Sequence, residues 1–390
     1  MSSNALIRIL RDRRFLRGAC PKVILLLVVA NIAVLHWKSS MAEERRANLT
    51  VGDVKALNQS NRYDYTFGED LLATWSGIPD ATKNHLVVLS GMSQMFTINE
   101  PQPEDQRISE ELDDRLSPRG VRVYGLAAPN LCNEEALFLL LALLEQPQTT
   151  PRSFIYGVCF DKFRNIDLRP GYMTFLQAKP HLVAAWKQTA EEYRVKYPLA
   201  ADKMLQTLRD LHSEEEHDRP ANSVCEKALR DFVSTGIPIV AERKELNAFI
   251  QGRLYVFRNS LLGLKNTSKR PIIRTRYDMN RQFLELIIDV SKRAGVQFIA
   301  YIIPLNPLAD NPYIPREYEE FKTWIEGLAI ARSVPFANLE NLVPTEEWGM
   351  FMGGPDFKHF KGAAHRRVAS KLEQEFGSLL TSSANSEVAP

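Results

Sequence analysis

The residues best suited to chemistry lie in two short stretches that are far apart in the sequence. Ser93 follows a run of four apolar residues, Leu86 to Leu89, with Gly91 in between. Asp356 and His359 stand three residues apart, shortly before a stretch with helical periodicity. A neutral serine is a poor nucleophile, whereas an imidazole whose tautomer is held by an aspartate can take the serine proton. The pattern therefore predicts a serine nucleophile with a histidine base and an orienting acid.

Taken one at a time, these residues are ordinary. A serine after a strand is common, and an Asp-x-x-His pair is more often a surface feature than a catalytic one. Their order favours catalysis, because the serine follows the first predicted strand and the acid and base precede the last helix. The other histidines have simpler interpretations: His85 begins a strand and is expected to be solvated, and His365 is expected on the surface of the last helix.

Alternating strands and helices must bring these stretches together. The apolar run predicts a strand buried on both faces, and Gly91 is expected to let the backbone turn sharply before Ser93. Strand, helix and strand at this spacing indicate a parallel sheet, whose carboxyl edge is where such folds place their chemistry. Further strands are predicted at Val121–Leu126, Ser153–Val158, Val296–Ile303 and Val334–Leu339, helices at Asp105–Leu116, Glu134–Leu144, Asn280–Ala294, Tyr318–Ala331 and Gly362–Phe376, and a loop at Gly354–Phe360.

Shifts in composition divide the chain into several parts. An α/β domain is interrupted by a stretch of long amphipathic helices, which is typical of a helical insertion, and the C-terminus is low in apolar residues, which indicates disorder. The predicted parts are a cytoplasmic basic segment (1–22), a transmembrane anchor (23–37), a stalk (38–80), the α/β domain (81–165 and 275–376), the helical insertion (166–274) and a disordered tail (377–390).

The N-terminus predicts export. Arginines and a lysine precede the apolar run from Val23 to Leu35, and because basic residues stay on the cytoplasmic side, the rest of the chain is expected outside the cytoplasm. The run is shorter than the ~20 residues of a comfortable span, so a signal peptide cleaved after Ala42 is an open alternative. Trp37 and Lys38 are awkward just before such a cleavage site, which favours an uncleaved transmembrane helix.

The overall composition excludes little. A net charge of +2 over 390 residues shows no bias toward polyanions, and no nucleic-acid partner is expected. The sparse cysteines do not form a disulfide framework: Cys132 and Cys159 could pair, but buried free thiols are the favoured interpretation. His212 and His217 are five residues apart and do not share a helix face, so no metal site is predicted, and no cofactor is indicated.

The order of these motifs resembles the SGNH (GDSL-like) hydrolase superfamily over most of residues 80–376. Gly91-Met92-Ser93 is similar to the superfamily's first block, in which the serine follows a strand and a glycine, and Asp356-Phe357-Lys358-His359 is similar to its last block. The N-terminal anchor and Pro304-Leu305-Asn306 after a late strand most resemble the membrane-anchored D-alanyl transfer protein of teichoic-acid D-alanylation and its relatives in polysaccharide O-acetylation. The resemblance implies a flavodoxin-like, three-layer α/β fold, with Ser93 as nucleophile, His359 as base and Asp356 as orienting acid.

Two positions depart from the superfamily pattern. Met92 replaces the aspartate of Gly-Asp-Ser, which the transfer-protein relatives also lack, and Gly157–Asp161 stands where a Gly-x-Asn is expected. That asparagine normally helps to hold the oxyanion, so the pattern leaves the oxyanion donors open. Asp161, Lys162 and Arg164 follow the third strand, where they either line a substrate cleft or cap their loop.

Several groups are candidates for the oxyanion site or for substrate contact. The backbone amide of Ser93 is expected to be one donor, and Gly125 or Asn130, at or after the second strand, could supply another. Asn306 is expected to shape its loop and to lie near the site.

These features predict an exported, membrane-anchored serine acyltransferase or esterase that moves an acetyl- or D-alanyl-type group through an acyl-serine intermediate. The resemblance implies a multi-pass membrane-bound O-acyltransferase as partner and a cell-surface polysaccharide or teichoic-acid-like polymer as acceptor. The expected location is the inner or cytoplasmic membrane, with the catalytic domain on the periplasmic or extracellular side. Two alternatives are a hydrolytic deacetylase or esterase of surface glycans and a non-catalytic, polymer-binding scaffold.

Overall fold

The computed structural model describes residues 78–83, 85–217, 268–269, 271–351 and 354–382. All of these except His217 belong to one compact unit formed by Gln59–Glu216 and Asn266–Pro390. The predicted cytoplasmic segment and anchor, nearly all of the stalk, and part of the predicted insertion lie outside the described residues. Among the helices that are described, none is long and apolar enough to cross a membrane.

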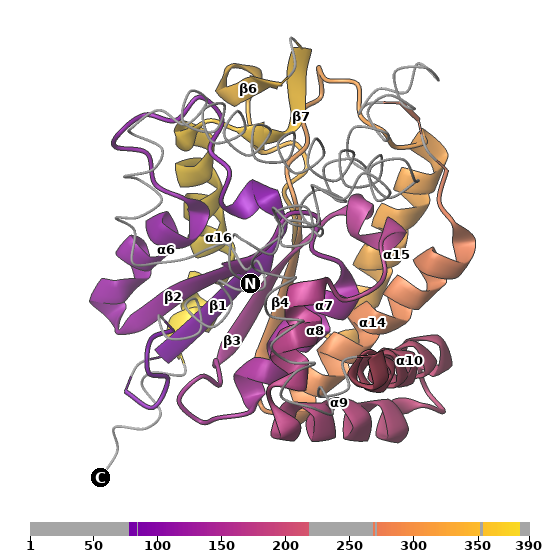
Figure 1. The fold of residues 1–390 in the computed structure, drawn as a ribbon. Coiled ribbons are helices and arrows are strands. Elements are labelled where there is room, and N and C mark those ends of the chain that lie inside the picture. Colours follow the sequence, from indigo (N-terminus) through magenta and orange to yellow (C-terminus); the bar gives the residue numbers. More distant parts are fainter. Residues whose placement is uncertain (1–77, 84, 218–267, 270, 352–353, 383–390) are drawn as a thin grey trace, which may run out of the picture. The chain divides into compact units, whose positions relative to one another are not determined.

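A parallel five-stranded sheet forms the centre of the unit (Figure 1), which confirms the predicted α/β class. Its strand order is β2-β1-β3-β4-β5, the order of flavodoxin-like doubly wound sheets. β1 begins at His85, one residue before the predicted apolar run, and His85 is buried, not solvated as expected. The strands are β1 (His85–Gly91), β2 (Val121–Ala127), β3 (Ser153–Val158), β4 (Gln297–Ile302) and β5 (Phe336–Asn338).

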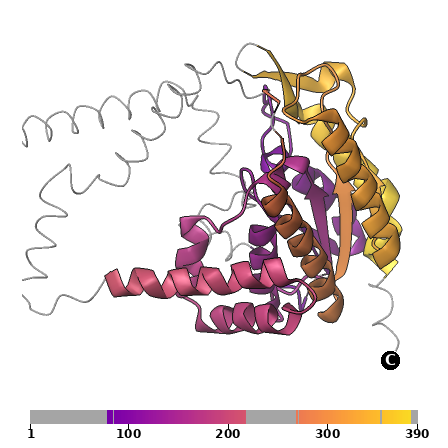
Figure 2. The same cartoon turned by 90° about the vertical axis from the view of Figure 1, so that its right-hand side faces the viewer.

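Helices cover both faces of the sheet, and the alternation of side chains along β1 shows why its apolar run is continuous. Leu86 and Val88 belong to the apolar cluster on one face, and Val87 and Leu89 belong to the cluster on the other. In Figure 2, β4 stands between α14 on one side and the yellow α16 on the other. The predicted three layers are therefore present, because each face of the strands needs an apolar cover.

Most helices begin and end near their predicted limits. Two helices differ more from their predicted limits, α14 at its start and α16 at its end. α14 begins six residues before the predicted Asn280, and the buried Tyr277 lies in this added turn. α16 continues to Ser382 because Leu380 is fully buried, so the predicted disordered tail begins too early at residue 377. The helices are α6 (Ile108–Leu116), α7 (Asn133–Leu144), α14 (Arg274–Arg293), α15 (Pro315–Arg332) and α16 (Gly362–Ser382).

Three helices make up the described part of the predicted insertion: α8 (Pro170–Gln177), α9 (Pro180–Tyr193) and α10 (Pro198–His217). Trp186 of α9 is fully buried, and its indole N–H donates a hydrogen bond to the backbone carbonyl of Met204 on α10 at 3.0 Å. Phe138 of α7 contacts this tryptophan, with 6.3 Å between ring centroids. These helices therefore share the apolar cluster that covers one face of the sheet.

The segment predicted as a loop at residues 354–360 is a strand, β7 (Gly354–Phe360), which pairs antiparallel with β6 (Trp348–Phe351). Phe360 of β7 packs edge to face on Trp348 of β6, with 5.5 Å between their ring centroids, and both side chains are buried in the apolar cluster that also contains residues of β1 and α16. The sequence of β7 hid the strand because it lacks an apolar run: Phe360 is buried, Phe357 is partly buried against the other apolar cluster, and polar residues stand between them.

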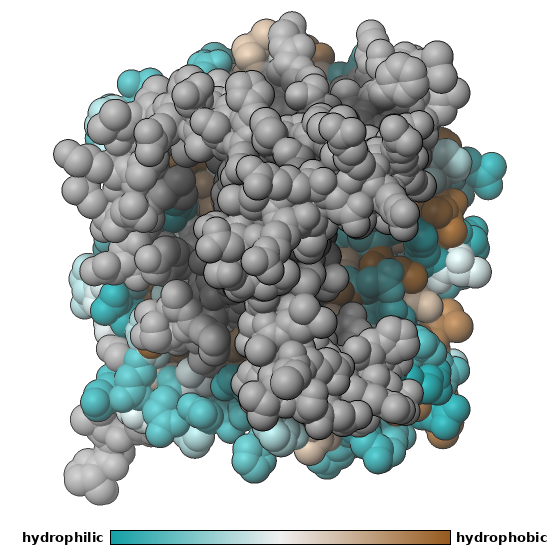
Figure 3. Space-filling model, in the orientation of Figure 1, coloured by the Kyte–Doolittle hydropathy of each residue, from teal (hydrophilic) through white to brown (hydrophobic). Residues whose placement is uncertain are grey.

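The coloured surface in Figure 3 is mostly hydrophilic, and its hydrophobic areas are small and separate. The large apolar side chains that are most exposed among the described residues, Val195, Leu308 and Ile330, come from different parts of the chain. Single exposed apolar residues are normal on soluble surfaces and indicate no particular partner.

Candidate active site

Ser93 opens a short 3-10 turn, Ser93–Met95, two residues after the end of β1, and is partly buried. Gly91 is the last residue of β1 and does not have a positive φ, so the chain turns after this glycine without needing its conformational freedom. The glycine is needed for space: a Cβ at residue 91 would lie 2.6 Å from Cε of Met95. Met95 packs tightly against β1 and thereby fixes the turn that carries the serine.

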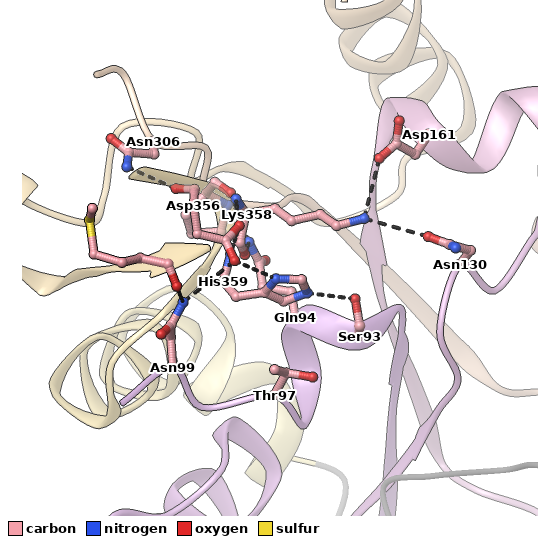
Figure 4. A network of polar contacts seen from close by, with 12 residues as sticks. Ser93, Gln94, Thr97, Asn99, Asn130, Asp161, Asn306, Asp356, Lys358 and His359 are labelled. Atoms are coloured by element: carbon pink, nitrogen blue, oxygen red, sulfur yellow. Dashed lines mark hydrogen bonds and ion pairs between the residues drawn. The ribbon is translucent and has the colours of Figure 1, made fainter. Parts of the chain in front are cut away.

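The hydroxyl of Ser93, the ring of His359 and the carboxylate of Asp356 form a continuous chain of hydrogen bonds (Figure 4). Ser93 Oγ is 2.8 Å from His359 Nε2, and His359 Nδ1 is 2.9 Å from Asp356 Oδ2. When Nδ1 carries the proton and donates a hydrogen bond to the carboxylate, Nε2 is unprotonated and can accept a hydrogen bond from the serine O–H. This is the arrangement in which an imidazole can act as a general base toward a serine.

Asp356 lies at the end of this chain and is nearly inaccessible to solvent, with 4% of its surface exposed. Burial alone would raise the pKa of Asp356, but hydrogen bonds from the His359 ring and the Lys358 backbone N–H lower it below its ordinary value. Its Oδ1 accepts the backbone N–H groups of Lys358 and His359 at 3.0 and 3.1 Å. These local bonds fix the chain around an ionised carboxylate.

Three amide side chains connect β7 to the rest of the unit, and sequence patterns indicated only one of them. Gln94, next to the serine, donates to the backbone carbonyls of Pro304 at 2.8 Å and Lys358 at 2.7 Å. Asn306, the predicted loop-shaping residue, donates to the backbone carbonyl of Asp356 at 2.8 Å. Asn99 donates to the carboxylate oxygen Oδ2 of Asp356 at 3.5 Å and to the backbone carbonyl of Met350, on the neighbouring β6, at 3.2 Å. Gln94 and Asn99 were missed because single amides carry no motif.

Lys358 connects two loops at the edge of the site. Its Nζ is 3.5 Å from Asp161 Oδ2, in the loop after β3, and 3.5 Å from Asn130 Oδ1, in the loop after β2. The side chains of Lys358 and Asp161 are 13% and 17% exposed, so this ion pair is largely shielded from water. The Asp-x-x-His motif did not indicate these contacts, because Lys358 occupies one of its unspecified positions.

The candidate oxyanion residues lie at different places. Gly125 is buried inside β2, paired in register with Leu89, and is part of the sheet instead of the loop beyond it. Asn130 is exposed in that loop, has a positive φ of 51°, and contacts Lys358. Asn306 holds the backbone of Asp356, as described above. Of these three, Asn130 is the one whose side chain contacts a residue at the mouth of the site.

His365, predicted on the surface, is instead completely buried on α16. Its Nε2 lies 3.2 Å from the backbone carbonyl of Thr97, to which it donates, and its ring packs against Phe360. Burial lowers the pKa of His365 to about 3, so this ring is neutral. The histidine supports the segment that follows Ser93, while His359 is the one that meets the serine.

The described residues contain no group of three or more His, Cys, Asp or Glu side chains placed to hold a metal ion. Cys132 and Cys159 are buried free thiols, as favoured from the sequence. Burial raises the pKa of Cys159 to about 11 and that of Cys132 well above its usual range, so neither is an activated nucleophile.

No family model and no curated protein matches this chain. A solved structure of a protein assigned as an acylhydrolase, from Bacteroides fragilis NCTC 9343, is similar to it with a TM-score of 0.36 and 9% sequence identity. The match covers 85% of this chain and 100% of that one. A likeness of this size carries no argument about function, which has to come from the geometry of the site.

Proposed function

We propose that the protein is a serine-dependent acyl-transfer enzyme in which Ser93 is the nucleophile, His359 the general base and Asp356 the acid that orients it. The observation that carries the proposal is the chain of two short hydrogen bonds, 2.8 and 2.9 Å, from Ser93 through His359 to Asp356. These groups come from segments that are 266 positions apart, and the amides of Gln94 and Asn306 fasten the later segment in place.

In the proposed reaction, Ser93 Oγ bonds to the acyl carbon while His359 Nε2 takes the hydroxyl proton. The bond between the acyl carbon and the leaving oxygen then breaks, and the imidazolium gives its proton to that oxygen. A second hydroxyl, from water or an acceptor alcohol, repeats the steps in reverse and releases the serine. The ionised Asp356 stabilises the imidazolium that forms twice in the cycle.

The test compares Ser93→Ala with Ser90→Ala, using an aryl acetate as donor. Ser90 is a matched control, because it is fully buried in β1, three residues away, and its hydroxyl has no partner in the described part of the chain. Ser93→Ala is expected to lose at least about a thousandfold in rate and to resist labelling by a fluorophosphonate, while Ser90→Ala keeps both. Equal activity of Ser93→Ala and wild type would refute the role of Ser93, and an absence of activity in both proteins would favour a non-catalytic scaffold.

The family and setting extend this proposal. We propose that the chain is an SGNH-type enzyme related to the D-alanyl transfer and polysaccharide O-acetylation proteins, anchored by residues 23–37 with its catalytic domain outside the cytoplasm. Its donor would be a multi-pass membrane O-acyltransferase and its acceptor a cell-surface polymer. The basic and then apolar N-terminus and the Gly-x-Ser, Pro-x-Asn and Asp-x-x-His motifs support this assignment.

Transfer and hydrolysis differ in what attacks the acyl-serine. Acyl-enzyme formed with an aryl acetate is mixed with polymer or with buffer alone, and the decay of the labelled Ser93 is followed by mass spectrometry. Transfer predicts slow decay in buffer and fast decay with polymer, together with an acylated product. Decay that is equally fast in both would identify the protein as a hydrolytic esterase or deacetylase.

A further inference from the structure

The topology of the sheet places the segments that follow β2 and β3 on either side of the candidate nucleophile. β1 lies between β2 and β3, and Ser93 follows β1. Asn130 is in the loop that follows β2, and Asp161 is in the loop that follows β3. A group that contacts both of these segments lies across the carboxyl end of β1, which Ser93 follows.

Lys358 makes this crossing. Its ammonium is 3.5 Å from Asn130 Oδ1 and 3.5 Å from Asp161 Oδ2. Figure 4 shows the side chain extending from β7 so that Nζ lies between these two residues, on the side toward which the Ser93 hydroxyl is presented. The backbone of Lys358 is held as well, because its N–H donates to Asp356 and its carbonyl accepts from Gln94.

The Lys358 ammonium has an N–H donor available for a further hydrogen bond. A lysine carries three N–H donors and no acceptor, and both of its oxygen neighbours lie at the long end of the hydrogen-bond range. With 13% of the side chain exposed, Lys358 is largely shielded from water by its neighbours and keeps some accessible surface. Charged donors in such surroundings form short, strong hydrogen bonds to anionic oxygens.

We propose that Lys358 is a catalytic residue that stabilises the oxyanion formed at Ser93, and this inference rests on the proposed function. When Ser93 Oγ bonds to the acyl carbon, the π electrons of the carbonyl move to its oxygen, which becomes negatively charged. The Lys358 ammonium donates a hydrogen bond to that oxygen and keeps its own proton throughout. The charge is neutralised again when the carbonyl re-forms and the leaving oxygen departs.

Asn130 and Asp161 are positioning residues in this proposal. Asp161 holds the ammonium by charge from the β3 side and Asn130 holds it from the β2 side, so the cation is in place before the negative charge appears. Preorganised donors of this kind act at the transition state because they need no rearrangement during the reaction. The proposal supplies the oxyanion donor that the sequence motifs leave open.

The experiment uses three variants of the full chain. Lys358→Met removes the cation. Lys358→Met combined with Asp161→Asn removes the cation without leaving an unpaired carboxylate beside the oxyanion. Lys361→Met is the matched control, because Lys361 lies three residues away on the same segment and pairs with Glu100 at 3.1 Å in a more exposed place. Circular dichroism and melting temperature establish that each variant folds, and kcat and KM are measured with an aryl acetate.

The single and double variants at residue 358 are expected to lose about 100- to 1,000-fold in kcat, with KM changed by less than about threefold. Both are also expected to bind a trifluoromethyl ketone, which forms a stable oxyanion on a serine, more weakly by a similar factor. Lys361→Met is expected to match wild type. Should the double variant keep kcat within about threefold of wild type and lose only melting temperature, the lysine is a structural tie and the inference fails.

Failure of the inference and failure of the proposed function give different results. If Ser93→Ala is inactive while the Lys358 variants retain kcat, the serine chemistry stands and only the role of the lysine is overturned. If Ser93→Ala is as active as wild type, the proposed function is wrong and the role of Lys358 falls with it.

Discussion

Two buried carboxyl groups show how differently one chain can treat the same chemical group. Asp356 is 4% exposed and Glu134, on α7, is completely buried. Burial raises the pKa of Glu134 to about 7 against the opposing effects of Lys203, the Asp167 backbone N–H and the Thr207 hydroxyl. Burial also acts on Asp356, but its pKa is lowered, because the His359 ring and backbone N–H groups outweigh the desolvation.

The pKa values of Asp356 and Glu134 shift in opposite directions because the two carboxyl groups have different hydrogen-bond partners. Asp356 shares its negative charge with an imidazole that can become a cation and with two backbone N–H groups. Glu134 accepts from the Asp167 backbone N–H and from the hydroxyl of Thr207 on α10, while the nearby Lys203 forms its ion pair with Asp167. The carboxylate beside His359 is thus kept ionised, whereas the pKa of the one between the helices lies near neutral pH.

The largest effect is expected from Asp356→Asn. An amide at this position cannot hold the His359 tautomer that leaves Nε2 free to accept the serine proton, so kcat is expected to fall by about 1,000- to 10,000-fold. Stopped assays with an aryl acetate measure this loss, and the melting temperature at neutral pH reports whether the fold is kept. A variant with more than a tenth of the wild-type kcat would show that Asp356 does not orient the base.

Glu134→Gln should leave the rate unchanged and alter how stability depends on pH. Because the pKa of Glu134 is raised from 4.5 to about 7 in the folded state, wild type binds an extra proton on folding between these values. Wild type is therefore expected to lose roughly 2–4 kcal/mol of unfolding free energy, relative to the glutamine variant, as pH rises from 4.5 to 7. Urea unfolding across this range measures the difference, and parallel curves for the two proteins would contradict it.

Asn306→Ala tests whether the acid at the site depends on its support. Asn306 donates to the Asp356 backbone carbonyl and accepts the Leu308 backbone N–H at 3.0 Å, so the alanine variant leaves buried backbone groups without partners. A loss of about 1–3 kcal/mol in unfolding free energy is expected, with kcat reduced by less than about tenfold. Asn306→Asp, which keeps the acceptor and loses the donor, separates the two bonds.

The smallest effect is expected from Thr207→Val, which removes the hydroxyl donor to Glu134. The pKa of Glu134 is then expected to rise further, and the unfolding free energy at pH 8 to fall by about 1 kcal/mol. Thr207→Ser keeps the hydroxyl and is the matched control. If valine and serine behave alike in urea unfolding at this pH, the hydroxyl does not stabilise the carboxylate.

The sheet could be predicted from the sequence because its strands are apolar on both faces. β3 was predicted to the residue, and β1 within two residues at either end, since a strand buried between helix layers shows as an unbroken apolar run. Strand β7 could not be predicted in this way, because it has no apolar run: Asp356, Lys358 and His359 point their polar groups into the site. The end of α16 was misjudged at Gly377, a residue that a helix tolerates when its neighbour Leu380 is buried.

The members of the site were partly predictable, because some of them belong to local sequence motifs. The Gly-x-Ser and Asp-x-x-His spacings identify Ser93, Asp356 and His359 as groups that belong together, although their catalytic role stays a prediction. The contacts of Gln94 and Lys358 depend on how three loops meet in space, and no local pattern reports that. Gly91 was singled out correctly for the wrong reason, because it serves the turn by leaving room for Met95 and not by a positive φ of its own.

Under the proposed function, the separation of the serine and the histidine by 266 positions also governs when the protein can react. A nascent chain that has emerged only as far as α15 already carries the alcohol but has no proton acceptor for it. In the proposed mechanism such a chain does not react with acyl donors, because the serine has no base. The order of synthesis would then delay the chemistry until β7 has docked and the polypeptide is almost finished.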